Sequence, residues 1–294
     1  MADESSKIPE KTVEQIFDER YPLDKWEDSN YSILDKFSMR RRNGLVTGAA
    51  AGMGRNAAAA FAQAGADVAL VDLPSQEDKL TELAKDMSER FGTNVIALTC
   101  DVTNVEQVAE LKTQLVEQLG TVDFAFLNAG VNVPGDDQDA TEEVWTRTIN
   151  INLNGTYRTG RIAHEIMREH GNGGSLIFTA SLSGHNANYM MGSPTPVNAY
   201  GATKAAIMEH SRYLAAALAK DGIRSNTISP GYVWSGIFNG RIDLPGHDAM
   251  LEVVPMHRFG TNDEIASTVL FLASDASSYV TGIDIRVDGG YSVF

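Results

Sequence analysis

From residue 44 onward, short apolar runs alternate with longer stretches in which apolar and polar residues follow a helical spacing. The apolar runs are Leu45–Thr47, Val68–Asp72, Val95–Cys100, Phe124–Asn128, Ser175–Thr179, Arg224–Ile228 and Asp284–Val287. The stretches between them are Asn56–Ala64, Gln76–Phe91, Val105–Leu119, Glu142–His170, Ala199–Lys220 and Asp263–Ser274. Strand followed by helix, repeated along a chain, predicts a parallel sheet with helices on both faces. Seven strands predict a doubly wound, Rossmann-type α/β fold, which binds dinucleotides.

The first 42 residues do not follow this alternation. They contain few aliphatic residues, many acids and scattered aromatics. Such a segment cannot bury a core by itself. Within it, Lys11–Arg20 is a candidate short helix that Pro22 would end. We therefore expect an N-terminal arm, residues 1–42, followed by one large α/β domain, residues 43–294.

Composition narrows the partners of the protein. The formal net charge of −15 argues against nucleic acid or an anionic membrane, because surfaces that bind phosphates need clustered Lys and Arg. No apolar stretch is long enough to span a membrane, and the N-terminus lacks the order of a secretory signal. We expect a cytoplasmic protein whose partner is a small molecule.

Metal and disulfide chemistry are not expected. Cys100 is the single cysteine, so neither an intrachain disulfide nor a zinc site of several thiolates can form. The six histidines show no metal-binding spacing. Only His185, beside a predicted pocket loop, has a position of interest.

A glycine-rich turn joins the first predicted strand to the first helix. Gly48, Gly52 and Gly54, with Met53 between the last two, lie in this turn. Glycines let the backbone approach a pyrophosphate, and the N–H groups at the helix start attract its charge. Turns and helix packing also collect glycine. The preceding strand, and an acid that closes the next strand, favour a dinucleotide site over that alternative.

The acid is Asp72, which lies 18 residues after the last glycine of the turn. A carboxylate at this place accepts the ribose hydroxyls of NAD and repels a 2′-phosphate. Neither Ala51 nor Leu73 provides a cation for such a phosphate, and Arg55 is expected to point outward from the helix. We therefore predict NAD(H) as cofactor. Asp101, after the third strand, is a candidate for binding adenine or for capping the next helix.

Tyr200 and Lys204 lie near the start of a predicted helix, and their spacing places them on one face. A free tyrosine has a pKa of about 10, which is poorly suited to proton transfer near neutral pH. A neighbouring ammonium, together with a positive nicotinamide, is expected to lower that pKa. This spacing is common in ordinary helices, so the surrounding motifs decide its meaning.

Together these motifs resemble the short-chain dehydrogenase/reductase family over residues 40–294. The matching elements, in order along the chain, are Thr47-Gly48-xxx-Gly52-x-Gly54, Asn128-Ala129-Gly130, Ile151-Asn152-Leu153, Ser181 at the end of the fifth strand, Tyr200-xxx-Lys204, Pro230-Gly231 and Val287-Asp288-Gly289-Gly290.

The resemblance implies a role for each matched residue. Tyr200 would be the general acid and base, and Ser181 would hydrogen-bond the substrate oxygen. Lys204 would hold the nicotinamide ribose and lower the pKa of Tyr200. Asn152 would hold a water molecule that links Lys204 to solvent, and Asn128 would support the sheet beside the cofactor.

The resemblance also implies which residues surround the cofactor, since main-chain groups after Pro230-Gly231 would receive the nicotinamide amide. The expected set is Gly48, Gly52, Met53, Gly54, Asp72, Asp101, Val102, Asn128, Ala129, Gly130, Tyr200, Lys204, Pro230, Gly231, Val233 and Ser235.

Three departures from the family pattern matter. Leu127-Asn128 replaces a double asparagine, which affects sheet support more than chemistry. Ser235 replaces the usual threonine after Pro-Gly and keeps its hydroxyl. Ser181 and Tyr200 are 19 residues apart, which is longer than usual. The additional stretch, His185–Val197, should border the substrate pocket.

The segments expected around the substrate are rich in methionine and aromatic residues. They contribute Tyr189, Met190, Met191, Tyr232, Trp234, Ile237, Phe238, Met250, Val253, Val254 and Met256. Such a lining suits a large rigid hydrophobe, whereas a polyol needs polar partners. We assign Tyr189, Met190, Tyr232 and Trp234 to the substrate. Packing at a subunit interface or within a lid is the alternative for this apolar set.

The acidic arm and this loop are similar to bacterial NADH-linked 20β-hydroxysteroid dehydrogenases, so a steroid-sized ketone is the main expectation. A sugar-alcohol dehydrogenase is the alternative, since similar arms and the sequence Ile33-Leu34-Asp35-Lys36-Phe37 also occur in that group. A non-catalytic, NAD-sensing scaffold is a third hypothesis. The intact Asn152, Ser181, Tyr200 and Lys204 argue against it.

The resemblance implies a homotetramer. In the family the helices around 142–170 and 199–220 pair into a dimer, and the last helix and strand join two dimers. The arm has too many apolar groups for a freely solvated tail. We expect it to bind a neighbouring subunit, and packing against its own subunit is the alternative. These groups are Tyr21, Leu23, Trp26, Tyr31, Ile33, Leu34 and Phe37.

Overall fold

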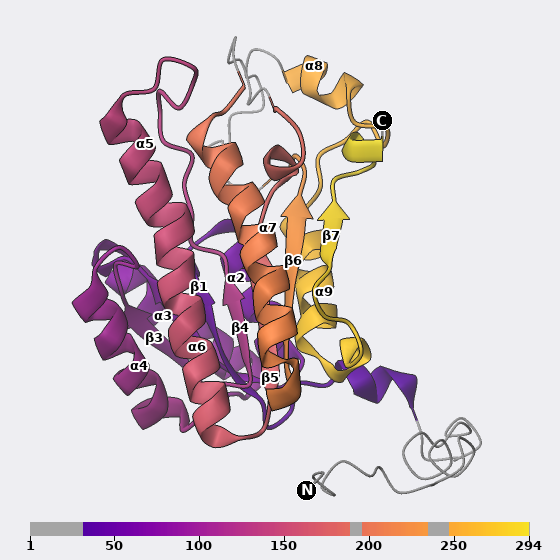
Figure 1. Cartoon of the computed structure of the whole chain (residues 1–294). Coiled ribbons are helices and arrows are strands. Elements are labelled where there is room, and N and C mark those ends of the chain that lie inside the picture. The colour runs from indigo at the N-terminus through magenta and orange to yellow at the C-terminus, as the bar shows by residue number, and fades with distance from the viewer. Residues whose placement is uncertain (1–31, 189–195, 235–246, 294) are drawn as a thin grey trace, which may run out of the picture. The chain divides into compact units, whose positions relative to one another are not determined.

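The computed structural model describes residues 32–188, 196–234 and 247–293. All seven predicted apolar runs form one parallel sheet in the order β3-β2-β1-β4-β5-β6-β7 (Figure 1). The strands are β1 (Asn43–Thr47), β2 (Asp67–Asp72), β3 (Val95–Thr99), β4 (Phe124–Leu127), β5 (Gly174–Thr179), β6 (Ile223–Pro230) and β7 (Asp284–Val287). This order confirms the doubly wound α/β prediction. The direction of winding reverses between β1 and β4, where such sheets open a crevice at their carboxyl ends.

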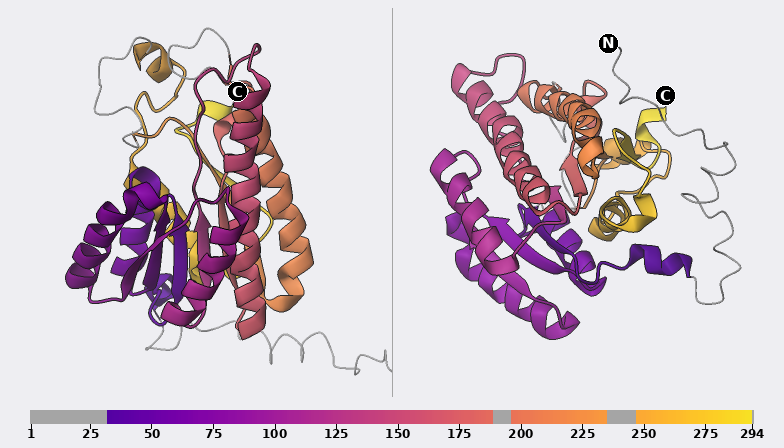
Figure 2. Two further views of the ribbon diagram at one scale, coloured as in Figure 1. Left: turned by 90° about the vertical axis from the view of Figure 1, so that its left-hand side faces the viewer. Right: turned by 60° about the horizontal axis from the view of Figure 1, so that its bottom comes forward.

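Helices cover both faces of the sheet, as Figure 2 shows in two further views. One face packs against α2, α3 and α9, and the other against α4, α6 and α7. The helices are α2 (Gly52–Gln63), α3 (Glu77–Phe91), α4 (Val105–Leu119), α5 (Glu142–Ile149), α6 (Thr156–His170), α7 (Ala199–Leu218), α8 (His247–Glu252) and α9 (Asn262–Ala273). The strands read as near-continuous apolar runs because both of their faces are buried.

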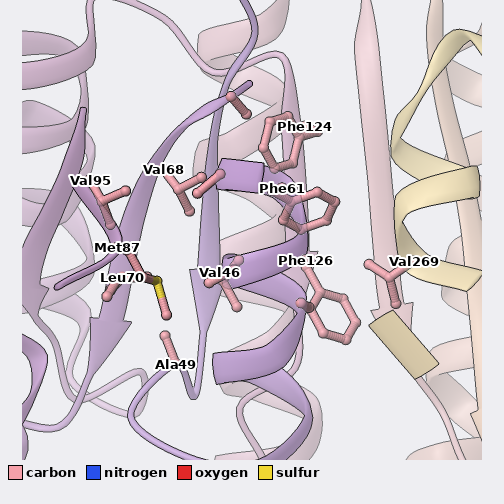
Figure 3. Packing of buried hydrophobic residues seen from close by; sticks show 14 of the residues in the cluster. Val46, Ala49, Phe61, Val68, Leu70, Met87, Val95, Phe124, Phe126 and Val269 are labelled. Atoms are coloured by element: carbon pink, nitrogen blue, oxygen red, sulfur yellow. The ribbon is translucent and has the colours of Figure 1, made fainter. Parts of the chain in front are cut away.

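Aromatic side chains fill the centre of the layer between the sheet and α2 (Figure 3). The rings of Phe61 on α2 and Phe124 on β4 lie 4.5 Å apart between centroids. Phe126 on the same strand and Val269 on α9 extend the cluster toward the other edge. This packing anchors α2, and with it the turn from which α2 starts.

The long predicted helix at 142–170 is interrupted. After α5 the chain makes a π-helical segment, Asn150–Gly155, and continues as α6. The Thr156 hydroxyl donates to the carbonyl oxygen of Asn152 at 2.6 Å. Single π-helical turns inside helices frequently occur at functional sites. The interruption falls at Asn152, one of the predicted site residues.

The chain divides into two units, residues 1–36 and residues 37–294. The larger unit begins before residue 43, because Met39 is buried in its core and the Phe37 ring lies 6.4 Å from that of Phe271. In the smaller unit the described part is Ser32–Lys36, whose last four residues begin the 3-10 helix Ile33–Phe37. The expected helix at Lys11–Arg20 lies outside the described residues. No helix in the described part of the chain is long and apolar enough to cross a membrane.

Candidate active site

The glycine-rich turn between β1 and α2 needs its glycines for two different reasons. Gly48 and Gly52 have positive φ angles, 68° and 54°, which side chains rarely adopt. A Cβ at Gly54 would overlap the carbonyl oxygen of Gly48 and crowd the amide of Asn128. Ala51 caps α2 without a side-chain hydrogen bond. The N–H groups at the helix start are therefore not taken by a side-chain cap, which suits a pyrophosphate.

A cavity of about 660 Å³ opens beside this turn, along the carboxyl ends of β1 to β4. Its size and position at the winding reversal suit a dinucleotide. Most of the residues predicted at the cofactor line it. The lining comprises Gly48, Ala51, Gly52, Met53, Val71, Asp72, Leu73, Cys100, Asp101, Val102, Thr103, Asn128, Ala129, Gly130, Val131, Arg147, Asn150 and Ile151.

Asp72, the last residue of β2, is held by the main chain. Its Oδ2 accepts the N–H of Ala50 at 2.9 Å, and its Oδ1 accepts the N–H of Leu73 at 2.8 Å. Each oxygen keeps further lone pairs for another donor. Arg55, which was expected to point outward, is exposed on α2. The part of the cavity beside β2 thus presents a carboxylate held in place by two main-chain N–H groups.

Asp101 forms a local turn after β3. Its Oδ1 accepts the N–H of Thr103 at 2.9 Å and the Thr103 hydroxyl at 2.7 Å. Asn104 caps α4, with its side chain accepting from the N–H of Gln107 at 3.0 Å. The alternative that Asp101 caps this helix is therefore wrong, because the helix starts three residues later than that alternative assumed.

Asn128 connects three strands below the cavity. Its N–H donates to the hydroxyl of Thr47 at 2.9 Å, and its side-chain amide donates to the Thr47 carbonyl oxygen at 3.3 Å. The Thr179 hydroxyl donates to its Oδ1 at 3.2 Å. These bonds join the ends of β1, β4 and β5, so the geometry matches the supporting role that the resemblance implied.

Tyr200, Ser181 and Lys204 meet at the carboxyl end of β5. The Tyr200 hydroxyl is hydrogen-bonded to Ser181, and the Lys204 Nζ lies 5.5 Å from the centre of the Tyr200 ring. Lys204 is 3% exposed, and its Nζ donates to the carbonyl oxygen of Thr179 at 2.6 Å. The structure therefore brings together three of the four residues predicted for catalysis.

Burial governs the titration of both groups. It lowers the pKa of Lys204 to about 8, because a desolvated ammonium is disfavoured. It raises the pKa of Tyr200 above its ordinary value, and the hydrogen bond with Ser181 opposes that rise. Lys204 by itself does not lower the pKa of Tyr200, and the expected lowering by Lys204 together with the nicotinamide stays a prediction. The Lys204 ammonium lies over the ring but donates its hydrogen bond to the Thr179 carbonyl oxygen and not to the phenol. Desolvation therefore dominates the pKa of Tyr200.

Asn152, the fourth predicted residue, is completely buried and holds the loop after β4. Its Nδ2 donates to the Val131 carbonyl oxygen, and the Val131 N–H donates to its Oδ1, both at 2.8 Å. A Cβ at Gly130 would lie 3.1 Å from this Oδ1 and 3.6 Å from the Lys204 Nζ. Glycine at 130 lets the loop pass between Asn152 and Lys204. The expected water between Asn152 and Lys204 stays a prediction.

The segment after β6 packs against the C-terminal region. The Gly231 N–H donates to the Val287 carbonyl oxygen at 3.0 Å, and a Cβ at Gly231 would collide with Asp288. Val233 is buried and pairs with Gly260 as an isolated bridge. These contacts fix residues 231–234 directly beyond the carboxyl end of β6.

Of the residues assigned to the substrate, Tyr232 and Trp234 are described. The Tyr232 hydroxyl donates to Oδ1 of Asn188 at 2.8 Å. The Trp234 ring lies 6.0 Å from that of Phe259. Tyr189, Met190 and the predicted cofactor residue Ser235 lie outside the described residues.

From the sequence, His185 had no defined role and Arg147 was not indicated, and both lie near the site. His185 follows the short 3-10 turn Leu182–Gly184, and its Nε2 lies 2.9 Å from Oδ2 of Asp284 and 3.2 Å from the Ser229 hydroxyl. Arg147 on α5 lines the cofactor cavity. Nothing in its local sequence distinguishes Arg147 from an ordinary surface arginine, because only the packing of α5 beside α7 and the segment Asn150–Gly155 brings it to the cavity.

Comparisons with known proteins agree with this geometry. The family model described as enoyl-(acyl carrier protein) reductase matches residues 48–292. Sorbose reductase of Schizosaccharomyces pombe is 40% identical over 257 residues, covering 87% of this chain and 97% of that protein. The NADP-dependent mannitol dehydrogenase of Alternaria alternata is 35% identical, covering 89% and 96%.

A solved structure matches the whole fold. The crystal structure of a short-chain type dehydrogenase/reductase from Mycobacterium marinum superposes with a TM-score of 0.83 at 35% identity, and covers 90% of this chain and 100% of that chain. Because the matches span the sheet, the glycine-rich turn and the Tyr200–Lys204 helix together, this chain belongs to the short-chain dehydrogenase/reductase family and is an oxidoreductase that interconverts secondary alcohols and ketones with a nicotinamide cofactor.

Proposed function

We propose that the protein is a ketose reductase, or polyol dehydrogenase in the reverse direction. The observation that carries the proposal is the similarity to sorbose reductase over 87% of the chain, with a mannitol dehydrogenase among the other relatives. These relatives favour the sugar-alcohol alternative over the steroid expectation. The catalytic groups are intact, which supports an enzyme over a non-catalytic scaffold.

A second hollow presents several polar side chains that suit the same substrate class. A volume of about 740 Å³ adjoins the segment that follows Ser181. Hydroxyl groups must stay hydrogen-bonded when they are buried, so a polyol needs such partners. The hollow offers polar groups from Asn186, Glu252, His257 and Tyr291, although its surface is more apolar than polar; Val253 and Pro255 complete the lining.

The apolar lining expected for a steroid is smaller than the sequence suggested. Met250 and Val254 are 7% and 2% exposed, so they pack within the protein and offer little surface to a ligand. Val253 and Met256 are exposed. Helical packing around α8 turns two of the four apolar side chains inward, and sequence alone did not distinguish them.

The chain's own residues supply the proton and hold the substrate. The reduced nicotinamide, when bound, supplies a hydride to the carbonyl carbon. Tyr200 then donates its phenolic proton to the oxygen that has gained the electron pair, and Ser181 hydrogen-bonds that oxygen. The raised pKa of Tyr200 keeps this proton in place at neutral pH. Lys204 lies beside the ring to stabilise the phenolate that results.

NAD(H) is the cofactor that we propose. Asp72 lines the cavity with both oxygens already held by main-chain N–H groups, so it cannot swing away from a 2′-phosphate without losing them. The mannitol dehydrogenase relative is NADP-dependent. The cofactor preference therefore needs a direct kinetic comparison.

A substrate panel tests the proposal. Purified protein is assayed with NADH and with NADPH on L-sorbose, D-fructose, cyclohexanone and a C21 steroid with a 20-keto side chain. We expect turnover on the ketoses. Turnover of the steroid without the ketoses would overturn the polyol proposal and restore the steroid expectation.

We propose a cytoplasmic homotetramer to which the arm contributes. The arm up to residue 31 lies outside the described residues, so the proposal rests on its sequence. Deleting residues 2–31 should lower the melting temperature and make it depend more on concentration, with kcat unchanged. A truncated protein that remains tetrameric with unchanged melting would remove the arm from assembly.

A further inference from the structure

A carboxylate from a distant loop holds the first turn of α7. Oδ1 of Asp136 accepts the N–H of Ala199 at 2.7 Å, and Oδ2 accepts the N–H of Tyr200 at 2.8 Å. The residue at the N-cap position, Asn198, makes no side-chain cap, and its amide instead donates to the Asp137 carbonyl oxygen at 3.2 Å. Asp136 thus satisfies N–H groups that every helix start leaves without partners.

This carboxylate is buried. Asp136 is 7% exposed and Ala199 is completely buried. Water is therefore poorly placed to replace the two hydrogen bonds, and a buried N–H without a partner is costly. A negative charge at a helix N-terminus is stabilised by the helix dipole, and hydrogen bonds to a carboxylate are stronger than neutral ones. Asp136 therefore holds the start of α7 strongly to the loop that follows β4.

Tyr200 lies in the turn that Asp136 holds. Its main-chain N–H is one of the two donors, while its hydroxyl meets Ser181, which comes from the end of β5. The start of α7 therefore determines where the phenol lies relative to Ser181. We propose that Asp136 is a positioning residue, which acts on the reaction by fixing the main chain of Tyr200.

The loop that carries Asp136 also borders the cofactor cavity. After β4 ends it passes through Gly130 and Val131, which line the cavity, and Asn152 holds Val131 by two hydrogen bonds. The Asp136 N–H donates to the Val133 carbonyl oxygen at 3.2 Å. The same loop therefore lines the cavity at Val131 and caps α7, the helix of Tyr200, through Asp136.

The test compares Asp136→Ala and Asp136→Asn with the matched control Asp137→Ala. Asp137 is the next residue, and its replacement by alanine removes the same charge from the same loop. Its side chain accepts only the local N–H of Asp139 among the bonds described. The assay ketone is D-fructose or cyclohexanone, whichever the wild type reduces, so the test depends on the family's reaction and not on the polyol proposal.

We expect kcat of Asp136→Ala to fall about tenfold to a hundredfold, because small misplacements of a reacting group have effects of this size. The NADH dissociation constant should stay unchanged, and the solvent deuterium isotope effect on kcat should rise as proton donation becomes slower. Asp136→Asn keeps one acceptor oxygen and should lie between Asp136→Ala and wild type. Asp137→Ala should match wild type.

Amide hydrogen exchange gives a readout that needs no substrate. The peptide that contains Ala199 and Tyr200 should lose protection in both Asp136 variants and keep it in Asp137→Ala. Unchanged protection in Asp136→Ala, or a kcat of that variant within about twofold of wild type, would overturn the proposal. A lower kcat without a change in the solvent isotope effect would also overturn it, since that would indicate general destabilisation. If Asp136→Ala does not fold, Asp136→Asn decides.

Discussion

The Nζ of Lys204 lies 5.5 Å from the centre of the Tyr200 ring and donates its hydrogen bond to a main-chain carbonyl, that of Thr179. The ammonium is therefore beside the phenol without being bonded to it. Its charge favours the phenolate that forms after proton donation, while burial of the whole group disfavours any charge there. The protonation state of Lys204 therefore bears directly on the proton donation proposed for Tyr200.

The reduction rate should fall as the pH rises through about 8. Burial lowers the pKa of Lys204 to about 8, so the ammonium is present below that pH and is lost above it. Tyr200, whose pKa is raised, stays protonated over the same range. The measurement is kcat for ketone reduction from pH 6 to 10.

Lys204→Arg provides the matched comparison. A guanidinium keeps its charge throughout this range, so the alkaline decline should move upward, although the rate at neutral pH should be lower. A decline at the same pH in both proteins would mean that another group titrates.

Tyr200→Phe should abolish turnover while NADH still binds. Reduction leaves an alkoxide that needs a proton, and general acid catalysis typically contributes about 10²–10⁴-fold. Turnover is measured by NADH oxidation, and binding by fluorescence titration. Tyr157→Phe is the control, because Tyr157 is a half-exposed tyrosine on α6 whose ring lies 5.7 Å from that of His210. Retention of more than roughly a tenth of the wild-type rate by Tyr200→Phe would show that a different group donates the proton.

NADH should be preferred to NADPH by about 100-fold in kcat/KM. A carboxylate about 5 Å from a phosphate charge costs on the order of 3 kcal/mol at an effective dielectric near 20, and salt reduces this value. Asp72→Ser should narrow the preference. Asp78→Ser, which removes the same charge from the first turn of α3, should leave it unchanged. Comparable kinetics with both cofactors in the wild type would overturn the role of Asp72.

Gly54→Ala should destabilise the protein and weaken NADH binding. The added methyl group would overlap the Gly48 carbonyl oxygen within the cofactor turn, and overpacking of this kind typically costs about 1–3 kcal/mol. Thermal melting and NADH titration are the measurements. Gly260→Ala is the control, since a Cβ there meets its nearest neighbour at 3.5 Å, an ordinary contact. Equal effects of the two substitutions would argue against a tight turn at Gly54.

The sequence by itself determined the sheet and the glycine-rich turn, and it was enough to predict Tyr200 as the proton donor. Strands buried on both faces must be apolar throughout, so all seven were visible as runs. The turn after β1 is equally local, since positive φ at Gly48 and Gly52 and the close approach at Gly54 require glycine at those positions. Tyr200 and Lys204 were readable because one helix carries both.

Only the tertiary structure decided what surrounds these groups. The direction of the Tyr200 pKa depends on desolvation, which spacing along a helix does not reveal. Asp136 and Tyr200 are 64 residues apart in the chain, and Asp136 lies in a stretch that resembles an ordinary acidic surface loop. Likewise, whether Met250 and Val254 face a ligand or the protein's own core depends on how their segment packs. Contacts between distant segments leave no local sequence pattern, because the hydrophobic spacing of a segment shows that one face is buried but not which other segment covers it.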